Sequence, residues 1–348
     1  MKKLLVVLLS VFLIGVLIGP APLLAARHDG VEDALEQGAD RMVSLQGTYG
    51  GVPNIWEWII GSGISGNNIL GISATGLVAA YEKTKDRRYL AAAIAAGNTL
   101  VARYNAAIVG GVTWDDRPYS QDVEFLAWLS RESKNPVYGD VAVKWHSIIP
   151  AYKTAAENVN RYISRGSLAG WDLALQIRAA LAVGQKDYAK AVAAELIRRS
   201  ADWVGNTNPY GDLTILSYAS LLWALDQVGD NQEVISQYRS ALLTTQETDG
   251  SWDGGAYQTT AYAILGLSAN KGKDVKKALD SAGTFLVSSQ ADNGGWVYSD
   301  GSEYGEENSE VLMSLAALLK GGDITNIHKV KLSHKERGEH REKHKHMR

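Results

Sequence analysis

The chain has 348 residues, of which 46% are hydrophobic, and it contains no cysteine, which excludes disulfides and thiolate metal sites. The formal net charge is −3, but residues 328–348 hold eight basic and three acidic residues. Without that tail and the lysines at positions 2 and 3, 25 basic and 35 acidic residues remain, and so acidic a core argues against nucleic acid as a partner. An acidic core is compatible with neutral or cationic ligands.

The first 26 residues have the features of a secretory signal peptide. Two lysines precede an apolar run over residues 4–18, and helix-breaking residues at 19–22 lead to Ala25 and Ala26 before Arg27. We therefore expect a secreted or otherwise extracytoplasmic protein that is cleaved near Arg27 and has no stable membrane span after cleavage. The alternative is an uncleaved membrane anchor formed by residues 4–26. The apolar run is short for a membrane span.

The rest of the chain predicts helices separated by glycine-containing loops. In chain order we expect helices over residues 32–46, 69–84, 86–104, 123–130, 137–164 with an interruption at 150, 173–184, 187–203, 213–225, 232–246, 257–268, 274–290 and 307–320. Asn67, Asn68 and Asp212 stand where helix N-caps belong. The toroid domain is predicted over residues 27–325, followed by a basic, histidine-rich disordered tail over 326–348.

More polar helices alternate with more apolar ones, which is expected when helices form two concentric rings. The pattern predicts an all-α fold, a single (α/α)6 toroid of six helical hairpins with inner and outer rings. Each apolar helix follows a loop that contains a glycine, at positions 50, 111, 170, 211, 250 and 294. These six loops should gather at one end of the barrel, where a ligand site is expected at the mouth of the central cavity.

Three of these loops contain a recurring unit. Gln246, Gly250 and Trp252 are followed 44 residues later by Gln290, Gly294 and Trp296, and Gln46 and Gly50 begin a third unit with Val52 at the tryptophan position. The unit resembles the glutamine–tryptophan repeats of squalene and other terpenoid cyclases, which share an α/α toroid with protein prenyltransferases. The resemblance implies that the glutamines and tryptophans are structural and tie helix ends to the next helix.

The resemblance does not extend to the catalytic motifs. Prenyltransferases need a zinc-ligating cysteine, which is absent here. Terpenoid cyclases of this type protonate their substrate with Asp-x-Asp-Asp, but the nearest stretch, from Thr113 to Asp116, lacks the first aspartate. No Asp-Asp-x-x-Asp motif for a magnesium-bound diphosphate occurs either, and these cyclases pair two toroids. No cofactor and no metal site is predicted, and a shared fold does not establish a shared activity.

The loop face nevertheless combines carboxylates with aromatic rings, which suits sugars because their apolar faces stack on aromatic rings and their rims form hydrogen bonds. Hydrolysis of a glycosidic bond would use two carboxylates as acid and base, and a lyase would use a base such as Arg117 with calcium held by carboxylates. The candidate catalytic residues are Asp116, Asp115, Asp172 and Asp212. The candidate ligand-binding residues are Trp56, Trp58, Trp114, Arg117, Tyr119, Trp171, Tyr210, Tyr257, Glu307 and Glu310.

Each candidate also has a structural interpretation. Asp172 and Asp212 suit helix N-caps, Glu310 lies in a first helical turn where the helix dipole favours acids, and the tryptophans could pack the hairpins. Asp116 and its neighbours are harder to explain in this way, because they precede the apolar helix by several residues. Asp116 is therefore the leading catalytic candidate.

Three functions remain open from the sequence. The first is a carbohydrate-active hydrolase or lyase, or a carbohydrate-binding protein. The second is a terpenoid-cyclase-like protein that binds an isoprenoid or another apolar ligand, and the third is a non-enzymatic interaction scaffold. The expected partner is a small molecule, lipid or oligosaccharide. A polar cavity floor would favour the first function, an apolar aromatic floor the second, and a filled barrel the third.

Overall fold

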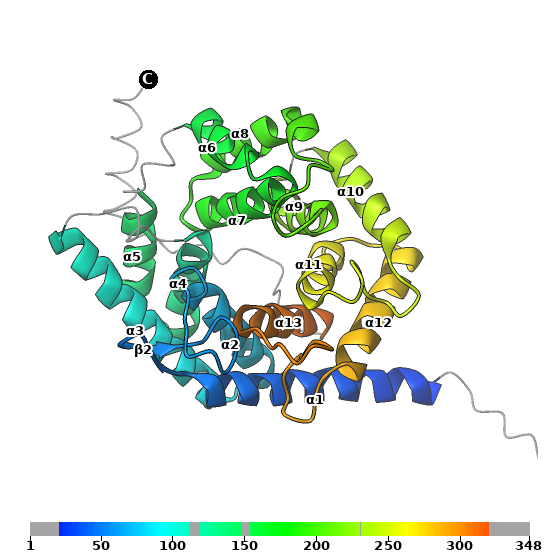
Figure 1. Ribbon diagram of the computed structural model, residues 1–348, viewed down its shortest axis with the longest axis horizontal. Coiled ribbons are helices and arrows are strands. Elements are labelled where there is room, and N and C mark those ends of the chain that lie inside the picture. Colours follow the sequence, from blue (N-terminus) through cyan, green and yellow to red (C-terminus); the bar gives the residue numbers. More distant parts are fainter. Residues whose placement is uncertain (1–20, 111–118, 148–153, 230, 320–348) are drawn as a thin grey trace, which may run out of the picture.

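The computed structural model describes residues 21–110, 119–147, 154–229 and 231–319. Six helices form a closed inner ring in which each packs on the next and the last packs on the first (Figure 1). In ring order they are α2 (Leu70–Thr84), α4 (Ser120–Ser133), α7 (Ala169–Ala182), α9 (Thr214–Val228), α11 (Tyr257–Ser268) and α13 (Gly305–Leu318). The protein is thus an (α/α)6 toroid, as the alternation of polar and apolar helices predicts.

The outer layer surrounds this ring. Its helices are α1 (Ala21–Leu45), α3 (Arg87–Gly110), α5 (Pro136–Ser147), α6 (Ala155–Ile163), α8 (Lys186–Arg198), α10 (Gln232–Thr245) and α12 (Lys273–Ser288). Two short 3-10 helices, η2 (Gly166–Leu168) and η3 (Ser200–Asp202), precede α7 and follow α8. The interrupted helix predicted over 137–164 corresponds to α5 and α6, so one outer position of the toroid holds two helices.

The inner helices approach one another closely because small residues stand at their contacts. The backbone N–H of Gly76 in α2 donates to Ser309 Oγ in α13 at 2.8 Å, and that hydroxyl donates to the Ile72 carbonyl at 2.6 Å. A Cβ atom at Gly76 would lie only 2.6 Å from the Ser309 carbonyl oxygen. Between α9 and α11, a Cβ at Gly266 would come equally close to the Ala219 carbonyl oxygen. These contacts leave no room for a larger residue at either glycine.

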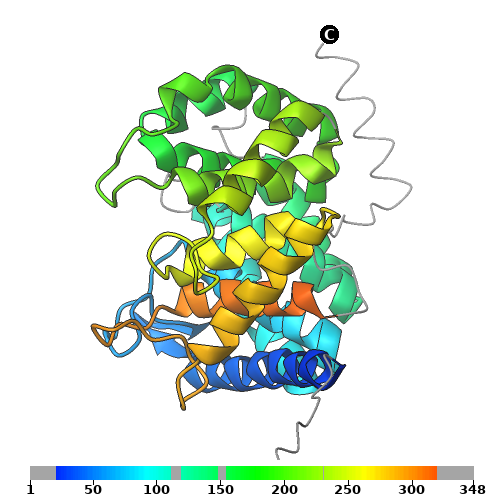
Figure 2. The same ribbon diagram turned by 90° about the vertical axis from the view of Figure 1, so that its right-hand side faces the viewer.

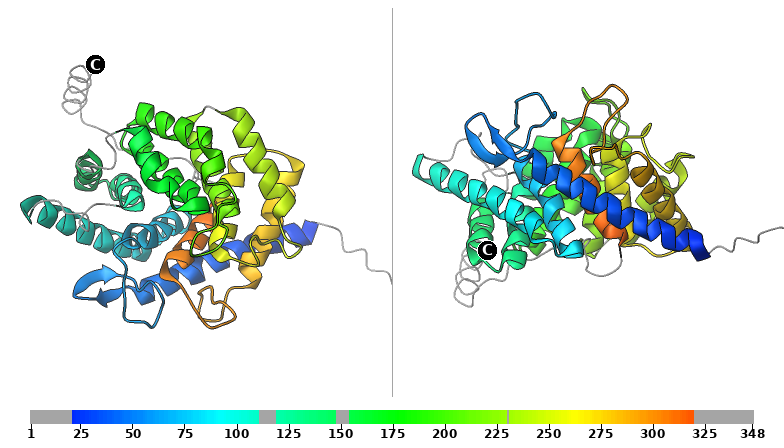
Figure 3. Two further views of the ribbon diagram at one scale, coloured as in Figure 1. Left: turned by 45° about the horizontal axis from the view of Figure 1, so that its top comes forward. Right: turned by 90° about the horizontal axis from the view of Figure 1, so that it is seen from below.

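The described loops before the inner helices project from one end of the toroid, as Figure 2 and the right-hand view of Figure 3 show. One of them contains a β-hairpin that the sequence analysis did not predict, formed by the antiparallel strands β1 (Gly47–Tyr49) and β2 (Val52–Ile55). The segment that follows β2 also pairs with the loop before α13. Main-chain hydrogen bonds run from Ile60 N to Glu303 O at 2.9 Å and from Gly305 N to Trp58 O at 3.1 Å. These bonds join the first and last helical hairpins of the toroid at its loop end.

The unit at Gln246 connects two neighbouring outer helices. Gln246 Nε2 donates to the Gly250 carbonyl at 3.0 Å and to the Ala278 carbonyl in α12 at 2.9 Å. The Trp252 indole is fully buried, and its Nε1 donates to the Leu242 carbonyl near the end of α10 at 2.9 Å. The glutamine therefore satisfies carbonyls of its own loop and of the next outer helix, and the tryptophan fixes the loop on the preceding helix.

The first unit contains a correction to the sequence analysis. Gln46 Nε2 donates to the Ala92 carbonyl in α3 at 2.9 Å, as its counterparts do, but the equivalent tryptophan is Trp56 and not Val52. Trp56 is fully buried and its Nε1 donates to the Met42 carbonyl at 2.7 Å, whereas Val52 is 40% exposed in the hairpin. The inserted hairpin moves the tryptophan four residues along the chain. With its ring and N–H both engaged in the core, Trp56 is not available as the ligand contact we expected.

Within the described ranges, no helix is both long enough and apolar enough to cross a membrane.

Candidate active site

Carboxyl groups from opposite sides of the inner ring meet at its loop end. Helices α7 and α13 are three positions apart in either direction around the ring (Figure 1). Asp172 lies in the first turn of α7, and Glu306 and Glu307 lie in the first turn of α13, one turn before Glu310. The charges of Asp172 and Glu306 nevertheless interact. Both carboxyl groups are largely buried, so an electrostatic interaction between these opposite helices places them on the inner side of the ring.

Glu306 is the carboxyl of this group that has no partner. It is 7% exposed and makes no hydrogen bond with any described residue. Burial raises the pKa of Glu306 to about 8, and the negative charges of Glu307 and Asp172 raise it further in the same direction. At neutral pH Glu306 is therefore a protonated acid whose proton is not committed to a neighbour.

Glu310 lies deeper in the ring than Glu306 and is fully buried. It accepts a hydrogen bond of 3.0 Å from Gln258 Nε2 in α11. Burial raises the pKa of Glu310 well above its ordinary value, and the nearby Glu306 and Glu307 add to the shift. Beside it, the hydroxyl of Tyr262 is fully buried, and Glu310 and Trp171 are the residues with which it interacts there. Burial also raises the pKa of Tyr262, followed by the charges of Glu310 and Glu306.

Asp172 is the carboxyl of the group that has a cationic partner. Its Oδ2 lies 2.5 Å from a guanidinium nitrogen of Arg165, and its side chain is 12% exposed. Burial raises the pKa of Asp172 to about 7, although the charge and hydrogen bond of Arg165 act in the opposite direction. Near neutral pH Asp172 is therefore present in both protonated and ionised forms, and its ionised form is the one that Arg165 stabilises.

Glu307 joins the group to the aromatic residues of the loop face. Its Oε2 accepts a hydrogen bond of 2.6 Å from the Tyr298 hydroxyl, and Tyr298 packs on Tyr257 with ring centroids 4.8 Å apart. Burial raises the pKa of Glu307 to about 7, against the hydrogen bond from Tyr298. Trp58 extends these aromatic contacts to the rim, where it is 45% exposed and meets the Tyr304 ring edge-on at 6.1 Å.

Aromatic rings and one ion pair lie beneath the carboxyl groups. Trp171 of α7 and Trp223 of α9 each meet the Tyr262 ring edge-on, at centroid distances of 6.3 and 6.0 Å. Arg178 stacks on Trp223 at 3.3 Å from the ring centroid and forms a buried ion pair with Glu124 of α4. Since α7 and α11 are not neighbours in the ring, the contact between Trp171 and Tyr262 also reaches across its interior. The lining that these residues form is both aromatic and polar.

Several predicted site residues take part in this arrangement. We call the set of Asp172, Glu306, Glu307 and Glu310 the carboxyl cluster. Three of its members, Asp172, Glu307 and Glu310, were predicted site residues. Two further predicted residues, Trp171 and Tyr257, lie directly beside the cluster. The leading candidates of the sequence analysis, Trp114, Asp115, Asp116 and Arg117, lie outside the described residues. Tyr119 is described, and its backbone N–H donates to Asp122 at the start of α4.

Other predicted residues have structural or peripheral positions. Asp212 is exposed, and its Oδ1 accepts bonds from the backbone N–H and hydroxyl of Thr214 at 3.0 and 2.6 Å, in the turn that leads into α9, whose N-cap residue is Leu213. Tyr210, in the same loop, is 70% exposed. Neither makes a contact with the carboxyl cluster.

The sequence analysis did not select Glu306, Gln258, Tyr262 or Arg165. Glu306 stands in an acidic run that reads as a solvated loop, and Tyr262 and Gln258 read as ordinary helix residues. The available signal was helical spacing, because Glu306 and Glu310 are four residues apart and so share one helix face, as do Gln258 and Tyr262. Within the described ranges, no three histidine, aspartate or glutamate side chains are grouped as a metal site.

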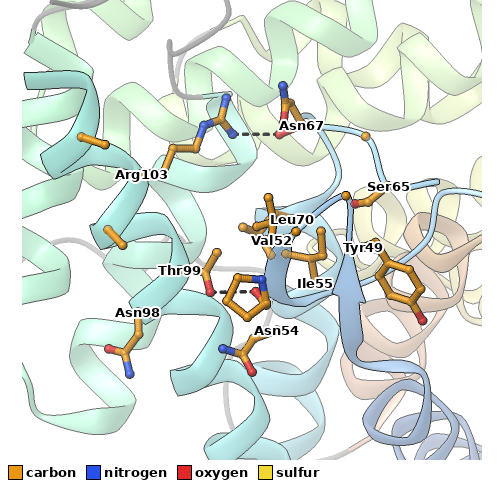
Figure 4. A pocket seen from close by; sticks show the side chains of 16 residues that line it. Tyr49, Val52, Asn54, Ile55, Ser65, Asn67, Leu70, Asn98, Thr99 and Arg103 are labelled. Atoms are coloured by element: carbon orange, nitrogen blue, oxygen red, sulfur yellow. Dashed lines mark hydrogen bonds between the residues drawn. The ribbon is translucent and has the colours of Figure 1, made fainter. Parts of the chain in front are cut away.

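A separate cavity of about 650 Å³ lies beside the hairpin, between β1–β2, the start of α2 and the outer helix α3 (Figure 4). Thr99 Oγ1 donates to the Pro53 carbonyl at 2.9 Å, and Arg103 donates to the Asn67 carbonyl at 3.1 Å. Tyr49, Asn54, Ser65 and Asn98 also contribute polar side chains to its lining. No carboxyl group lines this cavity, so it lacks the acid–base chemistry of the carboxyl cluster.

No protein-family model and no curated protein matches the chain. Solved structures do. The type II terpene cyclase MstE from Scytonema, in complex with geranylgeranyl dihydroxybenzoate, has a TM-score of 0.56 and 15% identity, covering 84% of this chain and 98% of the cyclase. A polysaccharide lyase has a TM-score of 0.56 at 11% identity, with 83% and 96% covered. An unsaturated glucuronyl hydrolase variant from Streptococcus agalactiae has a TM-score of 0.55 at 15% identity, with 86% and 93% covered.

These similarities span nearly the whole length of each solved structure, but the identities are too low to transfer an activity. They establish that this chain shares the α/α-toroid fold with both terpene cyclases and carbohydrate-active enzymes.

Proposed function

We propose that the protein is an exported carbohydrate-active hydrolase that cleaves a glycosidic bond at the carboxyl cluster. The observation that carries this proposal is the pair Glu306 and Asp172, two carboxyl groups that face each other across the ring in different surroundings. Glycoside hydrolysis needs one carboxylic acid and one carboxylate on opposite sides of the bond. Glu306 has a pKa of about 8 and no partner, which suits it to donate a proton, whereas Arg165 stabilises the ionised form of Asp172.

In the proposed reaction Glu306 gives its proton to the glycosidic oxygen as the bond between that oxygen and the anomeric carbon breaks. A water molecule adds to the anomeric carbon and transfers a proton to Asp172. Glu306 thus loses one proton and Asp172 gains one, and exchange with solvent restores both groups. Trp171, next to Asp172 in the chain, offers an aromatic face for the sugar ring.

The polar lining favours a sugar over an apolar ligand. A sugar can form a hydrogen bond with the free Glu306 carboxyl, whereas an isoprenoid would bury this group without a partner, at a cost of several kcal/mol. Asp115 and Asp116 are part of the proposal as further carboxylates of the loop face. Replacing Asp116 with asparagine is the direct test of their contribution, because a catalytic role predicts lost turnover with unchanged thermal stability.

The principal test is the variant Glu306→Gln. Against a panel of oligosaccharides, followed by release of reducing ends, its turnover should fall about 10²–10⁴-fold, which is the usual contribution of general acid catalysis. Asp292→Asn is the matched control, because Asp292 is an exposed carboxylate in the loop before α13. Full activity in Glu306→Gln would remove Glu306 from the reaction.

A second candidate, a terpenoid-cyclase-like activity, is favoured by one specific observation. Trp171 and Trp223 both contact the Tyr262 ring near the buried carboxyl groups, and acids and aromatic rings respectively start and stabilise carbocation reactions. The resemblance of the glutamine–tryptophan units to those of terpenoid cyclases points in the same direction. Incubation with geranylgeranylated phenols, followed by chromatography and mass spectrometry, would detect cyclised products of unchanged mass.

A further inference from the structure

The cavity beside the β1–β2 hairpin, which we call the hairpin cavity, is preformed. Its volume of about 650 Å³ lies in the range of ordinary small-molecule sites. Helix α3 is bonded to both of the other walls, by Thr99 to the Pro53 carbonyl at 2.9 Å and by Arg103 to the Asn67 carbonyl at 3.1 Å (Figure 4). Because these bonds already hold the walls together, a ligand would not have to order them when it binds.

Three asparagine side chains lie around an apolar centre in this cavity. The apolar side chains are those of Val52, Ile55 and Leu70, and the asparagines are Asn54, Asn67 and Asn98 (Figure 4). Asn98 Oδ1 accepts a hydrogen bond of 2.8 Å from the Tyr138 hydroxyl, and its Nδ2 has no partner among the described residues. The side-chain amides of Asn54 and Asn67 likewise make no hydrogen bond within the described ranges, since only their main-chain carbonyls are engaged. The cavity therefore offers three amides to a ligand.

The chemistry of the lining favours a neutral ligand that carries hydroxyl groups. An amide both donates and accepts hydrogen bonds, as a hydroxyl does. No carboxyl group occurs in the described lining, and its one cation, Arg103, is bonded to Asn67 and stacks over the Trp145 ring at 5.8 Å. The ring of Tyr49 adds an aromatic face. A neutral sugar ring matches this lining, because it has an apolar face and a rim of hydroxyl groups.

Aromatic contacts connect the carboxyl cluster with the hairpin cavity along the loop end of the toroid. Tyr298, which is bonded to Glu307, meets the Tyr304 ring edge-on at 6.0 Å, and Tyr304 in turn meets Trp58 at 6.1 Å. The backbone N–H of Trp58 donates to the Ile64 carbonyl at 2.9 Å, directly before the loop residues that line the cavity. A glycan chain that is bound at the cluster would therefore have aromatic surface to follow toward the cavity.

We infer that the hairpin cavity is a second saccharide-binding site, which holds a neutral sugar unit of a polysaccharide while another part of the same chain occupies the carboxyl cluster. This inference deepens the proposed function and rests on it for the presence of a glycan at the cluster. Binding in the cavity does not itself require cleavage. The consequence is that the protein should prefer long glycan chains over disaccharides, because only a long chain reaches both places.

The experiment is electrophoresis of the full mature protein through native gels that contain hydroxyethyl cellulose, arabinoxylan, galactomannan or laminarin at graded concentrations. We expect at least one of these neutral polysaccharides to retard the protein. The double variant Asn67→Ala, Asn98→Ala should raise the dissociation constant for that polysaccharide about tenfold or more, since two hydrogen bonds are lost.

The matched control is Asn105→Ala, because Asn105 is an exposed asparagine of α3 that does not line the cavity, and its replacement should leave the mobility unchanged. Thermal melts check that the double variant folds. If it does not, Val52→Glu is the second variant, since it places a carboxylate in the cavity from an exposed position of the hairpin. Retardation of this variant equal to that of wild type would also contradict the inference.

The outcomes separate this inference from the proposed function. Retardation that depends on Asn67 and Asn98, without cleavage of any glycan, would support the inference and overturn the hydrolase proposal. Cleavage of oligosaccharides with equal retardation of wild type and the double variant would overturn the inference and leave the hydrolase proposal standing. Retardation by none of the four polysaccharides, or by the anionic polygalacturonate alone, would likewise overturn the inference.

Discussion

Gln290 Nε2 donates a hydrogen bond of 2.9 Å to the main-chain carbonyl of Ala34, which lies 256 residues earlier in the chain. The same nitrogen donates to the Gly294 carbonyl at 2.8 Å, and Trp296 Nε1 donates to the Leu286 carbonyl at 2.8 Å. The bond to Ala34 therefore joins the last outer helix to the first and helps to close the outer ring. It is the long-range equivalent of the bond from Gln246 to Ala278.

Replacing Gln290 with alanine should destabilise the protein by about 1–3 kcal/mol, because two partly buried carbonyls lose their donor. Chemical denaturation with urea measures this change. The control is Gln237→Ala, since Gln237 is an exposed residue of α10 and its replacement should change the free energy of unfolding by less than about 0.5 kcal/mol. Equal stability of the two variants would show that the bond to Ala34 contributes nothing to ring closure.

The buried tryptophans should contribute more than the glutamines. Trp252, Trp296 and Trp56 are at most 1% exposed, and replacing any of them with alanine should cost about 3–5 kcal/mol because a large cavity forms. Trp58, at 45% exposure, provides the comparison, and its replacement should cost less than about 1 kcal/mol. A cost for Trp56→Ala as small as for Trp58→Ala would contradict the assignment of Trp56 to the first unit.

The toroid was predictable because its signals are local and repeated. Helical spacing and loop glycines recur in each hairpin, and the period places Trp252 and Trp296 without knowledge of any contact. Trp56 was missed because a hairpin of two short strands lengthens the first loop and shifts the tryptophan out of register. Such an insertion is visible only when the loop is seen to pack on Met42 and on the loop before α13.

The sequence predicted three of the four residues of the carboxyl cluster, but it did not predict how they are arranged. Asp172, Glu307 and Glu310 could be selected as acids near a loop face, but their mutual approach depends on ring closure, which brings α7 and α13 into opposition. The sequence also cannot distinguish an acid that faces solvent from one that faces the ring axis when they are adjacent in one helical turn, as Glu306 and Glu307 are. Their different partners appear only in the folded structure.

The buried acids make the stability of the protein depend on pH. The pKa values of Glu306 and Asp122 are raised by burial to about 8 and about 6, and burial also raises the pKa of Glu310 well above its ordinary value. Between the ordinary carboxyl pKa of about 4.3 and these values, the folded protein holds protons that the unfolded chain has released, so stability falls as the pH rises. The melting temperature should therefore be higher at pH 5.5 than at pH 8.0. Glu310→Gln should reduce this fall in melting temperature with pH, and Asp292→Asn should leave it unchanged. A melting temperature that rises with pH would contradict the raised pKa values of these acids.

Export can be tested on the position of the mature N-terminus. Helix α1 begins at Ala21, so cleavage before Arg27 removes its first turns but keeps the core residues Val31, Ala34 and Leu35. Expression with the complete leader should yield a mature chain that starts near Arg27 by mass spectrometry and melts at the same temperature as a protein expressed without residues 1–26. Recovery of an intact chain in the membrane fraction would support the alternative of an anchor formed by residues 4–26.

The proposed roles of Glu306 and Asp172 predict a bell-shaped dependence of kcat/KM on pH. The acid must be protonated, so the rate should fall as the pH rises above about 8, the pKa to which burial raises Glu306. The base must be ionised, so the rate should fall as the pH drops below about 7, the pKa of Asp172. Because the two charges interact, the limbs report the titration of the pair, and the maximum should lie between these values.

Two variants assign the limbs of this profile to particular residues. Arg165→Gln removes the cation beside Asp172, so the pKa of Asp172 should rise and the acidic limb should move to higher pH, while the alkaline limb stays in place. Glu306→Gln should lower kcat and abolish the alkaline limb, because glutamine has no proton to lose. A lowered rate with both limbs unchanged would show that Glu306 only supports the structure of the site, and an unmoved acidic limb in Arg165→Gln would exclude Asp172 as the base. Thermal melts of both variants, measured at the same pH values, separate a change in the reaction from a loss of folded protein.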